Sequence, residues 1–300
     1  GLGIPAEPLF RSGRRPEPLK PIYSATGSHD PFYYTVNAYQ GSSDHVVFND
    51  FGVQVPGVMF VTWPDNYYHT SGDRPSIVDP TQLRRAVVTA AVSSYAIASA
   101  DATKALHIAQ EVATNASKRL TLEEQTLLRD INDAKVNNIN QVLKRSIFNL
   151  DAYLTAELIA LESTLQLAPT DAHTKAYVAQ LKAQLRVNHD QGVRSLTTAA
   201  QLRASTLNTK LAAITLTAEE KAADKIRPRA TKKAHNEGHG VLNTLEQPTK
   251  ERRYVRGYKN EIASLTIGGL RSILDIKKAL DAQYPDAESL EDIKSYIEKL

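Results

Sequence analysis

The run VPGVMFVTW, residues 55–63, is followed by the polar loop PDNYYHTSGDRP, residues 64–75, and this order decides the expected fold. The run is almost continuously apolar and rich in β-branched and aromatic residues, which favours a strand buried on both faces of a mixed or parallel sheet. Its Pro56 stands near the start, where a strand tolerates proline best. Residues Tyr33–Ala38 alternate like a second strand.

A helix start follows the loop. Asp79 suits the N-cap position, Pro80 the first helical position and Gln82 the third. A strand, a polar loop and a helix in this order are typical of the end of an α/β domain, and functional residues are expected on the loop. The first part of the chain is therefore predicted to be an α/β remnant, the end of a mixed-sheet domain.

A helical pattern occupies residues from about 81 to 224. Apolar residues recur there at spacings of three, four and seven, and the stretch Ala168–Asp171 interrupts them. Capping boxes are expected at Thr121 and at Thr217, each with Glu three residues later. The pattern predicts a mainly α-helical region of antiparallel helices, packed as a hairpin or bundle.

The sequence is expected to form three domains. Residues 1–118 would be the α/β part and residues 119–248 a helical appendage. Residues 249–300, with a helix start at Ser289, resemble a small winged-helix-like module that stops before its last strands.

Composition excludes several classes of function. The 300 residues carry 36 basic and 33 acidic side chains, and no dense basic stretch predicts a nucleic-acid partner. With no cysteine, the chain has no disulfide, no thiolate zinc site and no cysteine nucleophile. No apolar run reaches the length of about 18 residues that a membrane span needs. The start, Gly-Leu-Gly-Ile-Pro, has neither a signal peptide pattern nor an initiating Met, so the chain is expected to begin within a longer protein.

Residues 41–85 carry a resemblance to a known family. The matching stretches are Gly41–His45, Val55–Val58, Trp63–Asp65, Tyr67–Ser71 and Asp79–Leu83, with Asp73 between the last two. In order and spacing they resemble the C-terminal part of the catalytic domain in the zinc-dependent exopeptidase family of bacterial aminopeptidases, glutamate carboxypeptidases and glutaminyl cyclases. The resemblance implies a mixed-sheet domain, two zinc ions and hydrolysis of terminal peptide bonds by a zinc-held water.

The resemblance also implies roles for individual residues. His69 would be the last zinc ligand, and an exposed loop histidine is the alternative. Tyr68 would donate its phenol to the tetrahedral intermediate, as against packing at the pocket mouth. Asp44 and His45 would contact the substrate, with turn formation as their alternative. Asp73 is expected to bond within the loop, or to orient His69.

The rest of the family's metal site is not recognised in the sequence. The family's His-x-Asp pair and Glu-Glu pair should come before residue 41, where the sequence has one histidine, His29, and no Glu-Glu pair. Glu123-Glu124 and Glu219-Glu220 are explained as helix starts. The pair His235 and His239 lacks the zinc-protease order, in which Glu follows the first His directly.

These observations give a predicted function. The chain is expected to be the C-terminal fragment of a di-zinc exopeptidase, an aminopeptidase acting on peptides, and inactive alone because most metal ligands lie upstream. The alternative is a non-catalytic helical interaction or oligomerisation protein that retains a peptidase remnant, with the helical region as a homo-oligomer interface. By the same resemblance, an exported location, periplasmic or extracellular, is favoured for the parent enzyme.

Overall fold

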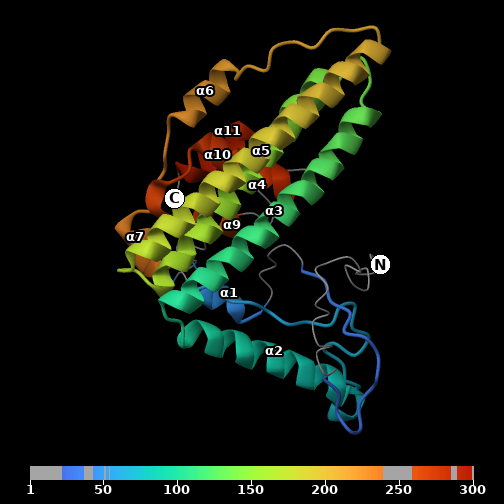
Figure 1. The fold of residues 1–300 in the computed structure, drawn as a ribbon, viewed down its shortest axis with the longest axis vertical. Helices are drawn as coiled ribbons and strands as arrows, with labels where there is room; N and C mark the ends of the chain where they lie inside the picture. Colours follow the sequence, from blue (N-terminus) through green and yellow to red (C-terminus); the bar gives the residue numbers. More distant parts are fainter. Residues whose placement is uncertain are drawn as a thin grey trace. The chain divides into compact units, whose positions relative to one another are not determined.

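The computed structural model describes residues 22–36, 43–50, 52–53, 55–238, 259–284 and 289–298. The chain divides into two compact units (Figure 1). The first comprises residues 1–37 and 60–99, and the second comprises residues 38–59 and 100–300.

The first unit is organised around α2, Pro80–Ala98, which follows the short 3-10 helix Pro75–Ile77. The predicted helix start is confirmed, because the Asp79 carboxylate caps α2 by accepting from the Thr81 N–H at 2.9 Å. The same carboxylate accepts from the backbone N–H and the hydroxyl of Ser28, and these bonds hold the pKa of Asp79 below its usual value. One turn later, the Arg85 guanidinium donates to the carbonyl oxygens of Ile22, at 3.2 Å, and Asp30, at 2.7 Å. Side chains of α2 therefore fix the preceding segment 22–30.

The predicted sheet is wrong. Within the described residues the chain forms no strand, and residues 55–63 are an extended coil whose Val58, Phe60 and Trp63 are 80%, 55% and 69% exposed. The described part of the second predicted strand, Tyr33–Val36, is also coil. An apolar run becomes a strand only when a neighbouring strand pairs with its N–H and C=O groups, and the described residues supply no such neighbour. The fold is mainly helical rather than an α/β remnant.

A three-helix bundle dominates the second unit. Helices α3, Ala102–Asp133, α4, Ile139–Ser163, and α5, Ala172–Thr206, run up, down and up beside one another (Figure 1). The predicted break between α4 and α5 is present as the 3-10 turn Thr164–Leu167. Asp171 then caps α5, because its carboxylate accepts from the Thr174 N–H. The bundle core contains Leu120, Leu127, Ile131, Ile139, Val142, Leu143, Leu150, Leu161, Val178, Leu185 and Leu196.

One predicted helix start in this unit is wrong. Thr121 lies inside α3, where its hydroxyl donates to the Ser117 carbonyl at 3.0 Å, so the helix continues through the expected capping box. The box at Thr217 is confirmed, because its hydroxyl and the Glu220 carboxylate each accept from the other's backbone N–H.

A second, smaller core joins the C-terminal helices. These are α6, Ala218–Asp224, α9, Lys259–Leu265, α10, Ile273–Gln283, and α11, Leu290–Ile297, with the 3-10 turn Ile267–Gly269 before α10. The short helix α7, Lys232–Glu237, comes between α6 and α9 in the sequence. Ser289 caps α11 as predicted. The buried members of this core include Ile262, Ile273, Ile276, Leu280 and Ile293, and α10 packs on α4. The domain boundaries stay a prediction: the one at 118/119 falls within α3, and the one at 248/249 lies outside the described residues.

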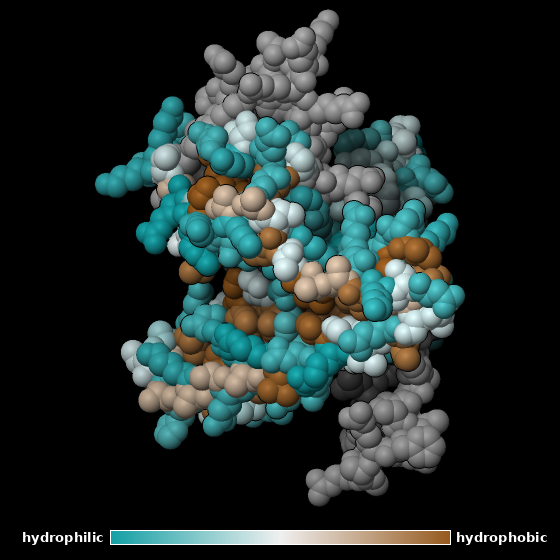
Figure 2. All heavy atoms as spheres, turned by 90° about the horizontal axis from the view of Figure 1, so that it is seen from above, coloured by the Kyte–Doolittle hydropathy of each residue, from teal (hydrophilic) through white to brown (hydrophobic). Residues whose placement is uncertain are grey.

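Among the described helices, none combines the length and apolarity of a membrane span. Figure 2 shows that apolar side chains nevertheless remain at the surface on the face drawn, among hydrophilic ones. The most exposed large ones include residues of the segment 55–63 and of α2, among them Leu83, Val87 and Tyr95.

Candidate functional site

The loop that follows Trp63 is wound on itself by short-range hydrogen bonds. Asp65 accepts from the Tyr67 N–H at 2.8 Å, and the Tyr67 carbonyl accepts from both the N–H and the hydroxyl of Thr70, at 3.0 and 2.7 Å. The Asp73 N–H then donates to the Thr70 carbonyl at 3.2 Å. These bonds fix the backbone on both sides of Tyr68 and His69.

Tyr68 and His69 lie together on this loop. Their rings are stacked, with centroids 3.8 Å apart and planes 18° from parallel. His69 has a φ of 57°, a left-handed conformation that is uncommon for a residue other than glycine. Both side chains are exposed, Tyr68 by 50%, so the phenol and the imidazole are accessible from solvent.

Asp44 and His45 belong to the other unit. His45 opens the short helix α1, His45–Phe48, and Asp44 precedes it. The Asn49 side chain clamps this turn to Gly57: its amide donates to the Gly57 carbonyl at 3.0 Å, and its oxygen accepts from the Gly57 N–H at 2.5 Å. A Cβ at Gly57 would lie 3.2 Å from the His45 carbonyl oxygen, a tight contact that glycine avoids. The structure thus brings Asp44 and His45 together in one unit, and Tyr68 and His69 together in the other.

The described residues do not form a zinc site. They contain no group of three or more His, Cys, Asp or Glu side chains placed to hold a metal ion. A protein zinc site needs three or four ligands, and His69 would supply one at most. The residues present therefore do not fit the two zinc ions that the resemblance implies. Of the rejected pair at 235 and 239, His239 lies outside the described residues.

A charged cluster that the sequence did not indicate connects α4, α5 and α10. The Asp151 carboxylate accepts from His189 Nε2 and from Lys278 Nζ, both at 2.9 Å, and His189 Nδ1 lies 3.1 Å from Asp190. The bond to Asp151 raises the pKa of His189 above its usual value, against the effect of burial. Burial opposes ionisation of Asp151, but its bonds to His189 and Lys278 outweigh burial and lower its pKa. The four residues are too far apart in sequence for a motif to reveal them.

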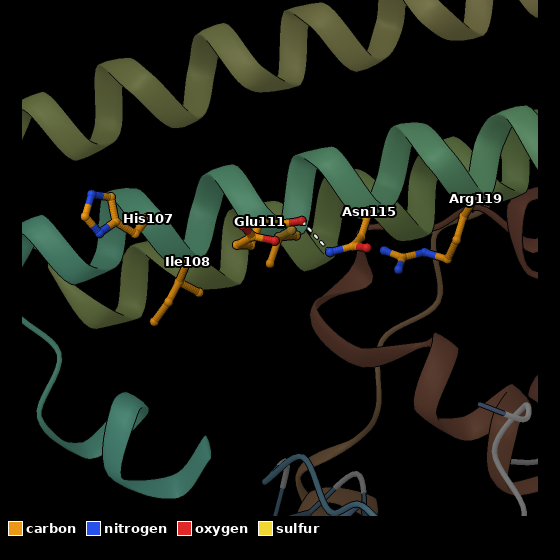
Figure 3. Close-up of a pocket in the computed structure, with 6 residues that line it drawn as sticks. His107, Ile108, Glu111, Asn115 and Arg119 are labelled. Atoms are coloured by element: carbon orange, nitrogen blue, oxygen red, sulfur yellow. Dashed lines mark hydrogen bonds between the residues drawn. The ribbon is translucent and has the colours of Figure 1, made fainter. Parts of the chain in front are cut away.

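A hollow of about 350 Å³ lies on α3, and Figure 3 shows residues that line it. Its described lining comes from one face of that helix and comprises His107, Ile108, Glu111, Val112, Asn115 and Arg119. The Arg119 guanidinium is already paired with both oxygens of Glu157, at 2.6 and 2.7 Å. The lining of this hollow contains none of the four predicted site residues, Asp44, His45, Tyr68 and His69.

Comparison with known proteins gives one match. Residues 17–94 match the model of peptidase family M28. No curated protein and no solved structure matches the chain. The match confirms the resemblance to this zinc exopeptidase family over that segment, which contains all four predicted site residues. At this coarse level the segment is similar to part of a metallopeptidase, a hydrolase.

Proposed function

We propose that residues 17–94 are part of the catalytic domain of a zinc-dependent exopeptidase that acts as an aminopeptidase on peptides. Tyr68 is the donor to the developing oxyanion, His69 is one zinc ligand, and Asp44 and His45 contact the substrate. The other ligands come from protein outside the present sequence, so this chain is inactive alone. The observation that carries the proposal is the adjacent pair Tyr68 and His69, exposed on a hydrogen-bonded loop inside the segment that matches the family.

The chemistry of the two side chains supports these roles. An imidazole nitrogen is a normal zinc ligand, and a bound zinc ion would supply Lewis-acid chemistry. The Tyr68 phenol carries an O–H donor, and one donor aimed at a developing oxyanion contributes about 3–4 kcal/mol to catalysis. Because Tyr68 is half-exposed, its hydroxyl can reach a substrate without a rearrangement of the core.

The uncovered apolar surface also supports the proposal. Leu83, Val87 and Tyr95 follow one stripe of α2 and are 55%, 58% and 73% exposed. An amphipathic helix of a folded domain buries its apolar stripe against another element. Covering each large apolar side chain would contribute about 1.5–3 kcal/mol. Further residues of a catalytic domain would provide this cover.

The test compares this chain with a longer product of the same gene, extended upstream. We expect the chain alone to retain less than one zinc ion after dialysis and to hydrolyse no aminoacyl substrate. The extended protein should hold two zinc ions and hydrolyse amino-terminal residues. The His69→Ala variant should lose zinc and activity together, whereas Tyr68→Phe should keep the zinc and lower kcat by about 10²–10³-fold.

His107→Ala is the matched control, because His107 is an exposed histidine on α3, outside the matched segment. It should change neither zinc content nor activity. An extended protein that binds no zinc, or a His69→Ala variant with full zinc and full activity, would refute the proposal. An active enzyme that releases carboxyl-terminal residues would correct the aminopeptidase assignment alone.

The helical region is proposed as an appendage of this enzyme. Its core is closed within the bundle, and self-association through it can be measured on the chain as it stands. Light scattering that gives a mass near 33.0 kDa would rule out an oligomer interface. Export of the parent enzyme is proposed on the family resemblance, and cell fractionation tests it.

A further inference from the structure

Three aromatic rings follow one another on the loop of the matched segment. The Trp63 ring meets the Tyr68 ring edge to face, with centroids 5.7 Å apart and planes at 80°. Tyr68 in turn stacks on His69. The indole therefore contacts the ring that stacks on the imidazole.

The backbone of this loop is fixed, but the Tyr68 ring is not enclosed. Hydrogen bonds at Tyr67 and Thr70 hold the main chain on either side, as described above. The Tyr68 side chain itself is 50% exposed, and Trp63 is 69% exposed, so the surrounding core does not restrict either ring. Among the described residues, Trp63 and His69 are the aromatic neighbours of Tyr68. The direction of the phenol thus depends on these two contacts.

We propose that Trp63 is a positioning residue that orients Tyr68 and, through Tyr68, the imidazole plane of His69. The contact between the positive edge of one ring and the negative face of another favours one side-chain rotamer of Tyr68. Without the indole, Tyr68 would turn among several rotamers and would stack on His69 for part of the time only. The catalytic meaning of this arrangement rests on the proposed function, whereas the arrangement itself does not.

The full chain offers a direct spectroscopic test. Trp63 is the only tryptophan, so the single indole N–H resonance reports on this loop alone. Proton NMR should show nuclear Overhauser effects between the Trp63 and Tyr68 rings. With labelled histidine, the His69 ring protons should be shifted upfield by the stacked phenol, and Tyr68→Ala should abolish that shift.

The variants of Trp63 decide the proposal. We expect Trp63→Ala to move the His69 resonances most of the way to their Tyr68→Ala positions, and Trp63→Phe, which keeps a ring edge, to restore them. Tyr33→Ala removes another exposed aromatic ring, 82% exposed, and should leave them unchanged. His29, which stacks on Tyr23 at 4.6 Å, is the internal control for folding.

Wild-type His69 resonances in Trp63→Ala would overturn the proposal, as would an indole without any contact to Tyr68. If Trp63→Ala also moves the His29 resonances, the loop or its surroundings have changed, and Trp63→Leu, which keeps apolar bulk without a ring, is measured in its place. Loss of the upfield shift of the His69 ring protons in Trp63→Leu then supports the proposal, and retention of that shift refutes it. All of these readings are independent of zinc and of hydrolysis, so failure of the proposed function leaves them intact.

Discussion

Replacing Asp151 with Asn should destabilise the helical unit by about 2–3 kcal/mol. Asp151 accepts hydrogen bonds from two cations, His189 and Lys278, whose side chains are only 12% and 15% exposed. A hydrogen bond to a charged group contributes about 1.5–3 kcal/mol. Asn keeps one acceptor oxygen and turns an amide N–H₂ towards the other donor, so at least one of the two bonds is lost. Breaking a fully buried pair costs about 3–5 kcal/mol, and the 32% exposure of Asp151 reduces that loss.

The assay is urea unfolding followed by far-UV circular dichroism, with Asp190→Asn as the matched control. Asp190 contacts the same histidine but is 64% exposed, so its loss should cost less than about 1 kcal/mol. Equal losses of unfolding free energy in Asp151→Asn and Asp190→Asn would refute the expected role of Asp151.

The difference in unfolding free energy between wild type and Asp151→Asn should depend on pH in a defined direction. The folded pKa of His189 is raised, so its contribution is complete below its unfolded pKa of about 6.5 and is lost as the pH rises through the folded pKa. The folded pKa of Asp151 is lowered, so its contribution is complete above an unfolded pKa of about 3.9 and is lost as the pH falls through the folded value. The difference in unfolding free energy between wild type and Asp151→Asn should therefore be largest from about pH 4 to 6.5 and should decrease above about pH 6.5. A free-energy difference that increases towards alkaline pH would contradict a stabilising bond between His189 and Asp151.

Three further substitutions test the helical bundle and the cap of α6. Arg119→Met leaves the Glu157 carboxylate, 8% exposed, without its bidentate partner and should cost about 3 kcal/mol in urea unfolding. Leu161→Ala empties a fully buried core position and should cost about 3 kcal/mol, whereas Leu202→Ala, at a 67% exposed position, should cost under about 0.5 kcal/mol. Thr217→Ala removes the capping box of α6 and should cost about 1 kcal/mol, seen as faster amide exchange in that helix.

Particular outcomes would contradict these expectations. Similar losses for Leu161→Ala and Leu202→Ala would mean that the bundle core is not closed as described. An Arg119→Met variant of wild-type stability would mean that the Arg119–Glu157 ion pair does not stabilise the bundle. Unchanged exchange in Thr217→Ala would place the start of α6 elsewhere.

Several features could be predicted because their signals are local in sequence. The caps at Asp79, Thr217 and Ser289 depend on a side chain and an N–H two or three residues away, and all three are present. Residues 41–85 carry the family resemblance and lie entirely within the matched segment, and the loop with Tyr68 and His69 is part of it. The cap predicted at Thr121 is wrong because a threonine hydroxyl can bond the carbonyl four residues back as well as cap a helix.

The main helices, the caps at Asp79, Thr217 and Ser289 and the peptidase-like segment could be read from the sequence, since side-chain chemistry and apolar spacing act within a few residues along the chain. The tertiary structure alone decided that the run 55–63 is a coil, because a strand exists only through hydrogen bonds to a partner that the run cannot specify. It also decided that Asp151, His189 and Lys278 form one cluster, because the packing of α4, α5 and α10 brings together residues far apart in sequence.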